Sequence, residues 1–348
     1  MKTISALVIT LLFGVCISAK TVNLSDYATP NDGQDDAAGF QTAIGDLQAA
    51  GGGTLVVTDG KWNLNNTINM VMYPIGISIK IVGSKGAVIQ PDLPPDRILF
   101  YVGNLNQFEM RDLIFVGDSS ASPDLGYLLY SSYVDQTRIT GCQFYGLRAG
   151  ESLIYIANTD AVIEHSLFHG IASKVGNITA VAFRGLTASH LQFIDYGNLG
   201  GAYYSKTPYG NTAWIYLDGA DSRTENALSQ RAVTISDARF DEGARYAIDA
   251  KNVSFLTVRG VQTNVSGMTD SAGIRMNNVL FASIEQSKFG FPALPRPAMV
   301  ALNNTKVLFN GISVGDGVYY GEKDASSEIH FDERFCTNCS IIPSRSAK

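Results

Sequence analysis

Four charged side chains in the middle of the chain are the residues best suited to chemistry: Asp218, Asp249, Lys251 and Arg275. Each lies in a short segment in which apolar and polar residues alternate, a pattern typical of a β-strand with one buried face. If these segments lie side by side, carboxylates and cations gather on one surface. Such a surface can bind a charged ligand and transfer its protons.

Two reactions suit these residue types, and the first is β-elimination from a uronate. A cation or metal neutralises the uronate carboxylate, and a basic side chain removes the neighbouring proton. Lys251 and Arg275 are the candidate bases, and Arg184 is the candidate clamp for the carboxylate. Asp218 and Asp249 could also hold Ca²⁺, which prefers oxygen ligands. There are more cations here than hydrolysis of a neutral sugar needs, which favours elimination.

The second reaction is glycoside hydrolysis by two carboxylates, about 5 Å apart for retention of configuration and about 6.5–9.5 Å apart for inversion. Asp218 and Asp249, on neighbouring repeats, could meet either distance. A structural interpretation also stands, because Asp249 and Arg275 on adjoining strands could form a surface ion pair worth at most about 1 kcal/mol. Lys251 beside Asp218 has the same alternative.

Aromatic residues gather near these charges. Two long irregular insertions, residues 194–212 and 220–231, flank the central strand. The candidate substrate-binding aromatic residues are Tyr203, Tyr204, Tyr209, Trp214 and Tyr216. Aromatic faces beside hydrogen-bonding groups suit sugar rings, which have apolar faces and polar rims. An extended groove along stacked strands would suit a polysaccharide chain.

Other titratable residues have different interpretations. His165 and His190 occupy equivalent positions in two repeats and are expected to be solvated turn residues, whereas His169 is ambiguous. A second acidic group on the neighbouring face could hold the site instead, and it consists of Asp195, Asp237, Asp241 and Glu242.

A repeated phrase positions the candidate residues. An apolar residue followed five positions later by Phe or an equivalent recurs about every 25 residues, with one longer interval. The phrases end at Phe115, Phe144, Phe168, Phe193, Phe240, Thr263, Phe289 and Val314. The short alternating strands in each unit predict a β-solenoid with about 4.8 Å between rungs. The longer interval, residues 193–240, is expected to be one turn with two insertions.

Alignment of the strands predicts two columns of outward-facing side chains. The first column is Tyr101, Tyr130, Tyr155, Ala182, Tyr216, Asp249, Arg275 and Ala301. The second is Gly103, Ser132, Ala157, Arg184, Asp218, Lys251, Asn277 and Asn303. Inward partners such as Ile215 and Leu217 should form a packed interior. Asn158, Asn278 and Asn304 are expected at strand ends, because Asn tolerates the left-handed turn conformation.

An amphipathic helix precedes the repeats. Phe40, Ile44 and Leu47 recur at helical spacing, and residues 51–53, all Gly, end the helix. This region resembles the pectate-lyase-like superfamily of right-handed parallel β-helix proteins in residues 22–27 (VNLSDY), 31–36 (NDGQDD), 40–44 (FQTAI) and 51–57 (GGGTLVV). The resemblance implies an all-β fold, a single-stranded right-handed parallel β-helix with an N-terminal capping α-helix. It implies less about the reaction, since such a phrase precedes lyases, hydrolases, epimerases and viral tailspikes.

The first residues are typical of an export signal. Lys2 is followed by an apolar run, residues 4–17, which is too short to span a bilayer, and then by Ser18-Ala19. We expect cleavage before Lys20 and a soluble mature protein, extracellular or periplasmic. A lipid anchor on Cys16 is the alternative, but the bulky Val15 before it disfavours that signal.

Composition narrows the partners. The net charge is −6 and Lys and Arg form no run, which argues against nucleic acid or anionic membrane as partners. Cys142 lies in an alternating segment and is expected to be a buried apolar side chain. Cys336 and Cys339 could form a zinc half-site, although a local disulfide is favoured in an exported protein.

These features combine into one expectation. Residues 1–19 are the signal peptide and residues 20–348 form a single parallel β-helix domain. We expect a secreted enzyme that degrades a polysaccharide, by β-elimination from a uronate-containing chain. The alternatives are a glycoside hydrolase that uses paired carboxylates in the same groove, and a non-catalytic carbohydrate-binding matrix protein. The oligomeric state is left open.

Overall fold

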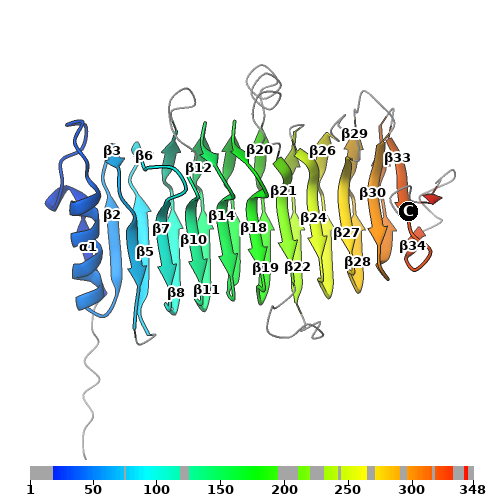
Figure 1. The fold of residues 1–348 in the computed structure, drawn as a ribbon, viewed down its shortest axis with the longest axis horizontal. Coiled ribbons are helices and arrows are strands. Elements are labelled where there is room, and N and C mark those ends of the chain that lie inside the picture. Colours follow the sequence, from blue (N-terminus) through cyan, green and yellow to red (C-terminus); the bar gives the residue numbers. More distant parts are fainter. Residues whose placement is uncertain are drawn as a thin grey trace, which may run out of the picture.

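The computed structural model describes residues 19–73, 76–117, 125–194, 211–219, 231–241, 244–264, 271–290, 296–315, 318–331 and 341–343. These residues wind into a parallel β-solenoid with three long sheets, which we call sheet 1, sheet 2 and sheet 3 in the order in which each turn visits them (Figure 1). A helix, α1 (Ala37–Ala49), lies at the N-terminal end of the solenoid. The predicted fold class is confirmed.

Sheet 1 has eleven strands in the spatial order β35 (Ile341–Pro343), β33 (Val318–Lys323), β30 (Arg296–Leu302), β27 (Ala272–Asn277), β24 (Ala244–Lys251), β21 (Asn211–Asp218), β18 (Gly176–Val181), β14 (Ser152–Ala157), β10 (Tyr127–Ser132), β7 (Ile98–Gly103) and β4 (Ile68–Val71).

Sheet 2 has twelve strands in the order β1 (Lys20–Asn23), β2 (Gly53–Val57), β5 (Ser78–Gly83), β8 (Gln107–Arg111), β11 (Gln136–Thr140), β15 (Asp160–Glu164), β19 (Gly185–Ser189), β22 (Ala232–Ser236), β25 (Phe255–Arg259), β28 (Phe281–Glu285), β31 (Lys306–Asn310) and β34 (Glu328–Phe331).

Sheet 3 has ten strands in the order β3 (Gly60–Leu64), β6 (Ala87–Pro91), β9 (Ile114–Val116), β12 (Gln143–Tyr145), β16 (Leu167–His169), β20 (Gln192–Ile194), β23 (Arg239–Phe240), β26 (Gln262–Asn264), β29 (Lys288–Gly290) and β32 (Ser313–Val314). A small sheet pairs β13 (Arg148–Ala149) with β17 (Ala172–Ser173), and a 3₁₀ helix, η1 (Leu24–Asp26), follows β1.

Residues in the left-handed conformation turn the chain from sheet 1 to sheet 2. The φ angle is 52° at Asn158, 57° at Asn278 and 62° at Asn304, so these three residues adopt the predicted turn conformation. The amide of Asn278 donates a hydrogen bond of 2.9 Å to Asn252 in the turn below. Side-chain amides therefore connect successive rungs at this corner.

The corner between sheet 2 and sheet 3 has the same backbone conformation. His165 and His190 have φ of 51° and 53°, are exposed, and stack with their ring centroids 4.5 Å apart. The prediction that both are solvated turn residues is confirmed.

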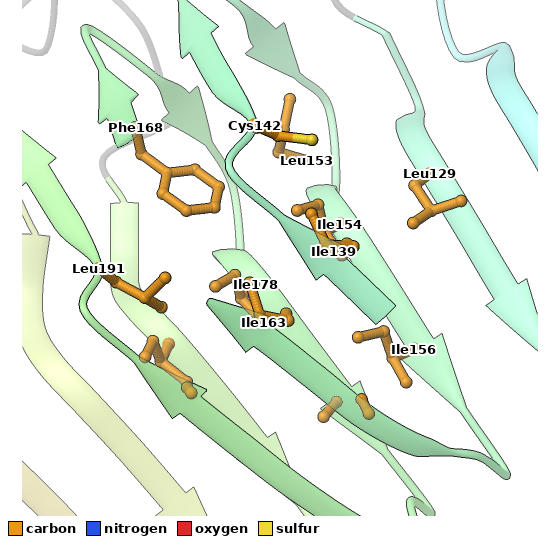
Figure 2. Close-up of a cluster of buried hydrophobic side chains, with 14 of the residues drawn as sticks. Leu129, Ile139, Cys142, Leu153, Ile154, Ile156, Ile163, Phe168, Ile178 and Leu191 are labelled. Carbon is orange, nitrogen blue, oxygen red and sulfur yellow. The ribbon is translucent and has the colours of Figure 1, made fainter. Parts of the chain in front are cut away.

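The interior is a continuous apolar core that contains a ladder of phenylalanine rings from sheet 3. Consecutive centroids lie 5.3, 4.8, 4.7 and 4.9 Å apart along Phe115, Phe144, Phe168, Phe193 and Phe240. Figure 2 shows Phe168, Ile154 and Ile163 converging from three different sheets. Cys142 is buried among them, and burial raises the pKa of its thiol to about 12, which confirms it as an apolar core residue.

The predicted cap closes the N-terminal end of this core. Phe40, Ile44 and Leu47 on one face of α1 are fully buried, and each such burial stabilises the fold by roughly 1.5–3 kcal/mol. The helix is followed by Gly51 and Gly52 with φ of 82° and 112°, a backbone that residues with a Cβ rarely adopt. Without the cap, the apolar end of the first rungs would face water.

Sheet 1 breaks the simple alternation of inward and outward residues. Leu128 and Leu129 of β10 are both fully buried. Trp214 and Ile215 of β21, three rungs further along sheet 1, form the same kind of buried pair. The residues on either side of this break pair one to one with those of the neighbouring strands, so neither strand of a pair holds an extra residue. The break lies at the same place in several strands, so the strands stay in register. It also turns one more side chain outward in these strands, three residues before the member of the first predicted column.

The register also corrects the predicted columns at β18. Thr179 pairs with Tyr155 on one side and Tyr216 on the other, so Thr179 occupies the place predicted for Ala182. The strand ends at Val181, which pairs with Asp218, and Ala182 begins the corner with φ of 48°. The outward positions predicted for this repeat therefore lie three residues too far toward the C-terminus.

Smaller corrections apply near the C-terminal end. Val300 and Leu302 occupy the places predicted for Ala301 and Asn303. Asn303 instead has φ of 53° and lies in the corner.

The ends of the chain lie mostly outside the described residues. The predicted signal peptide is described only at Ala19, and β1 begins at Lys20, the expected first residue after cleavage. Cys336 and Cys339 lie outside the described residues, so their disulfide stays a prediction. Among the described residues, no helix has the length and apolar character needed to cross a membrane.

Candidate functional site

Strands β21, β24 and β27 are neighbours in the middle of sheet 1 (Figure 1) and bring the predicted charged residues together. Asp218 pairs with Lys251, and Tyr216 pairs with Asp249. Asp249 pairs in turn with Arg275. All five side chains alternate with buried apolar residues of the core and therefore belong to the outer face of the sheet.

Lys251 contacts the tyrosine on the preceding rung. Its Nζ lies 3.1 Å from the hydroxyl oxygen of Tyr216 and 5.0 Å from the centre of the ring. Among the described residues, no carboxylate oxygen lies within salt-bridge distance of Nζ. The ammonium group is thus bound to a phenol, which leaves its charge available to an anionic ligand.

Asp249 and Arg275 form a buried ion pair on the same face. The Nε atom of Arg275 donates to Oδ1 of Asp249 at 2.8 Å, and a second guanidinium nitrogen donates to Oδ2. The Asp249 side chain is fully buried, and that of Arg275 is 26% exposed. Both carboxylate oxygens are therefore already occupied by Arg275 in a bidentate arrangement.

Tyr246 completes this cluster. Its hydroxyl accepts a hydrogen bond of 3.3 Å from the third guanidinium nitrogen, and the guanidinium carbon lies 4.4 Å from its ring centre. Burial raises the pKa of Tyr246, against the opposing effect of Arg275. Burial by itself would lower the pKa of Arg275. The hydrogen bonds and the charge of Asp249 outweigh this effect and raise the pKa of Arg275. The guanidinium is therefore permanently charged and the phenol is neutral.

Asp218 joins the site to the corner of the solenoid. Its Oδ1 accepts a hydrogen bond of 2.9 Å from the amide of Asn252. Asn252 in turn accepts one from Asn278, so Asp218 terminates the chain of side-chain amides that runs along the corner. This arrangement holds Asp218 at the edge of the cluster.

Similarity to known proteins is found at the level of the fold. No protein-family model and no curated protein matches the chain. Among solved structures, the DFA-IIIase from Arthrobacter chlorophenolicus A6 in complex with GF2 is similar with a TM-score of 0.61 and 12% identity, over 94% of this chain and 98% of that chain. The A-module of the Azotobacter vinelandii mannuronan C-5 epimerase AlgE4 is 16% identical over 94% and 96% of the two chains, with a TM-score of 0.48.

The likeness to the DFA-IIIase extends over nearly the whole of both chains and decides the architecture. The chain is a right-handed parallel β-helix. At this identity the similarity shows the fold and does not extend to the reaction, because one fold hosts many reactions. The expected architecture, a right-handed parallel β-helix, is confirmed, and the candidate site lies on its outer face.

Arg184 does not belong to this site of the β-helix. It lies in the corner after β18, where its guanidinium donates to the backbone oxygens of Val134 and Asp135 at 3.1 and 2.7 Å. It also pairs with the carboxylates of Asp135 and Asp160 at 3.3 and 3.6 Å. The prediction that Arg184 clamps a substrate beside Lys251 is wrong, because β18 ends before the position that the alignment assumed.

Trp214 lies in the core of the β-helix, where it cannot contact a substrate. Its side chain is 1% exposed, its ring centre lies 5.5 Å from that of Phe193, and its Nε1 donates to the backbone oxygen of Asp241 at 2.9 Å. The predicted substrate contact is wrong, because the break in alternation turns Trp214 inward together with Ile215. The other predicted aromatic residues, Tyr203, Tyr204 and Tyr209, lie outside the described residues.

Calcium does not fit the described carboxylates. Asp249 has both oxygens bonded to Arg275, and Asp218 is bonded to Asn252. Ca²⁺ takes six to eight oxygen ligands, and no three His, Cys, Asp or Glu side chains converge on a metal position within the described ranges. We therefore derive no step through calcium, and its binding stays a prediction.

Two features of the site were missed from the sequence. Tyr246 was not assigned, because two inward residues separate it from Asp249 and strict alternation would place it in the core. Tyr127 was the second: it packs edge-on against Tyr130 and Tyr155 of the predicted outward column, which stack on each other with centroids 4.8 Å apart. Recurring pairs of adjacent apolar residues in these strands were the available signal.

The second acidic group is only partly described. Asp237 has φ of 52° and lies at the corner of sheets 2 and 3. Asp241 directly follows β23 and pairs with Arg239 at 3.2 Å. Asp195 and Glu242 lie outside the described residues. Within the described part, these aspartates do not form a carboxylate pair.

Proposed function

We propose that the protein is a secreted enzyme that cleaves a uronate-containing polysaccharide by β-elimination, with its active site around Lys251 and Tyr216. The observation that carries the proposal is the 3.1 Å contact between Lys251 Nζ and the Tyr216 hydroxyl, on an outer face where Lys251 has no carboxylate partner among the described residues. The contact joins two groups that can pass a proton between them, as a general base and a general acid must.

The two residues have complementary roles. Lys251, in its neutral form, takes the proton from the carbon next to the uronate carboxylate, and the electrons of that C–H bond form a carbon–carbon double bond. The bond to the glycosidic oxygen breaks, and this oxygen takes the Tyr216 hydroxyl proton. The ammonium of Lys251 then returns a proton to Tyr216 along their hydrogen bond, which restores both groups.

Arg275 has a supporting role in this scheme. The negative charge that develops on the uronate carboxylate needs a fixed positive environment. Asp249 neutralises much of the charge of Arg275 but also holds its guanidinium rigidly on the face that bears Lys251. Arg275 therefore orients the substrate carboxylate, and Asp249 and Tyr246 keep Arg275 in place.

Hydrolysis by Asp218 and Asp249 is the less favoured reaction. A hydrolytic acid or base must reach the glycosidic oxygen or a water molecule. Asp249 is fully buried and bound through both oxygens, so it reaches neither without losing Arg275. A non-catalytic carbohydrate-binding protein would need the tyrosine surface but not the Lys251–Tyr216 contact.

The fold and the start of the chain accord with this proposal. The DFA-IIIase of similar fold is a carbohydrate-active enzyme. The start of the chain is typical of an exported protein, and export would bring the enzyme to extracellular or periplasmic polysaccharide. The N-terminal sequence of the exported protein would show whether it starts at Lys20.

The test measures two products of one incubation with a panel of acidic polysaccharides. Elimination produces an unsaturated uronate, detected by its ultraviolet absorbance, together with new reducing ends. We expect both signals to rise in wild type. Reducing ends without the absorbance would identify a hydrolase, and binding with neither signal would identify a carbohydrate-binding protein; either result contradicts the proposal.

Substitutions then locate the site. Lys251→Met and Tyr216→Phe should each lower the rate by about 10²-fold or more, as expected for loss of a general acid or base. Lys306→Met is the matched control, because Lys306 is an exposed lysine on sheet 2 that pairs with Glu328. A full rate in Lys251→Met would show that the reaction occurs elsewhere.

A further inference from the structure

A polar pocket lies on sheet 3, away from the site on sheet 1. It has a volume of about 210 Å³ and opens over the ends of β23, β26 and β29. Its lining residues are Arg239, Phe240, Asp241, Gln262, Thr263, Asn264, Lys288 and Gly290. This volume is below the roughly 300–1,000 Å³ of pockets that enclose drug-sized ligands, so the pocket suits only a small molecule.

The outward side chains of three consecutive rungs form the polar walls. Arg239 pairs with Gln262 across the sheet, and Gln262 pairs with Lys288, so a neutral amide lies between two cations. On the next outward position, Asn264 pairs with Gly290. Side-chain amides both donate and accept hydrogen bonds, which suits the hydroxyl groups of a sugar.

The pocket carries an excess of positive charge. Asp241 neutralises Arg239, with which it pairs at 3.2 Å, and it also accepts a hydrogen bond of 3.5 Å from Asn264. Lys288 is exposed, and within the described part of the chain no carboxylate pairs with it. An anionic group entering the pocket would therefore find one uncompensated cation beside the amides.

Gly290 leaves open space in the wall of the pocket. A Cβ placed on Gly290 would have no described atom within 4 Å, although the glycine itself is buried. The backbone is not in the left-handed region, so a larger side chain is allowed there and would project into the hollow. A glycine at this position keeps the floor of the pocket open.

We propose that this pocket is a second carbohydrate-binding site, which takes a single carboxylated sugar residue. Lys288 binds the carboxylate, and Gln262 and Asn264 bind the ring hydroxyls. Arg239 and Asp241 hold each other and form the opposite wall. The site is independent of the elimination reaction proposed for sheet 1 and requires only that the protein meets acidic sugars.

The test measures binding of free glucuronate by ligand-detected NMR, in the Lys251→Met background so that the sheet 1 site loses its free cation. We expect Lys288→Gln to weaken binding by about tenfold or more, as loss of a charge-assisted hydrogen bond implies. Gly290→Leu should abolish binding by filling the pocket, and Lys306→Gln, the matched control on sheet 2, should bind as its parent does.

Several results would overturn the proposal. These are no glucuronate binding in the parent protein, unchanged binding in both Lys288→Gln and Gly290→Leu, or equal binding of inorganic phosphate. Binding of neutral glucose as tight as that of glucuronate would exclude the assigned role of Lys288. Circular dichroism of each variant separates loss of the pocket from loss of the fold.

The outcomes for the two sites are distinguishable. Gly290→Leu in the otherwise unchanged protein should retain the polysaccharide-cleaving rate on short substrates, because it touches neither Lys251 nor Tyr216. If cleavage is absent from every variant but glucuronate binding follows the pocket substitutions, the sheet 1 proposal fails and this one stands.

Discussion

At the scale of single residues, Asp249 and Arg275 illustrate how burial changes the meaning of a charge. As exposed cross-strand neighbours they would contribute at most about 1 kcal/mol. With Asp249 fully buried, each charge depends on the other, because an unpaired buried carboxylate is costly. The pair therefore acts as a fixed part of the site and cannot act as a mobile acid or base.

This dependence predicts a large effect on stability. Arg275→Met should lower the free energy of unfolding by about 3–5 kcal/mol, because it leaves the Asp249 carboxylate buried without a partner. The double variant Asp249→Asn/Arg275→Met should recover most of the loss. Denaturant midpoints of the two variants and wild type provide the measurement, and equal midpoints for the single and double variants would contradict the buried-pair interpretation.

Cys142 makes a second prediction at this scale. Burial raises the pKa of its thiol to about 12, so hardly any thiolate exists at mildly alkaline pH. Alkylation of Cys142 in the folded protein should be negligible and should become complete in denaturant. Mass spectrometry of the peptide that contains Cys142 tests this, and ready labelling of the folded protein would show that the core opens locally.

At the scale of elements, the corner between sheets 1 and 2 links the site to the frame of the β-helix. Asn252 donates to Asp218 and accepts from Asn278, each at 2.9 Å, while its backbone has φ of 53°. One residue therefore turns the chain and joins three rungs. The position of Asp218 depends on this corner as much as on its own strand.

Substitutions at Asn252 should separate the two roles. Asn252→Gly keeps the backbone conformation but loses both side-chain hydrogen bonds. We therefore expect the free energy of unfolding to fall by about 1–3 kcal/mol. Asn252→Val should lower the free energy of unfolding further, because a β-branched residue in the left-handed region adds backbone strain. Thermal unfolding midpoints should fall in the order wild type, Asn252→Gly, Asn252→Val, and the reverse order for the two variants would refute the role of the backbone.

At the scale of the whole molecule, the β-helix gains its stability from rungs stacked on a common core. Its apolar interior, its phenylalanine ladder and its helical cap are all formed by packed apolar side chains. At the site, Arg275 supplies the positive charge that a metal would otherwise supply to Asp249.

Chelation therefore makes a prediction for the whole protein. Treatment with a strong calcium chelator should leave both the thermal midpoint and the polysaccharide-cleaving rate unchanged. Restoration of a lost rate by added Ca²⁺, with Mg²⁺ as control, would instead support the calcium-binding prediction made from Asp218 and Asp249. The thermal midpoint distinguishes a catalytic ion from a structural one.

The repeat, the helical cap, the asparagine corners and the buried Cys142 were all predictable from the sequence. Each depends on a local signal: spacing of apolar residues, a glycine run, or a residue type that tolerates the left-handed conformation. The alignment of Tyr216, Asp249 and Arg275 on successive rungs followed from the same periodicity and is confirmed.

The tertiary structure alone decided which side chains face the site. The inward turn of Trp214, the outward position of Tyr246 and the end of β18 before Arg184 all depend on where a strand breaks its alternation or stops. A shift of one residue reverses the face of a side chain in a strand, and local sequence does not determine that shift. Stacking against neighbouring rungs does, because the register of each strand must match both of its partners.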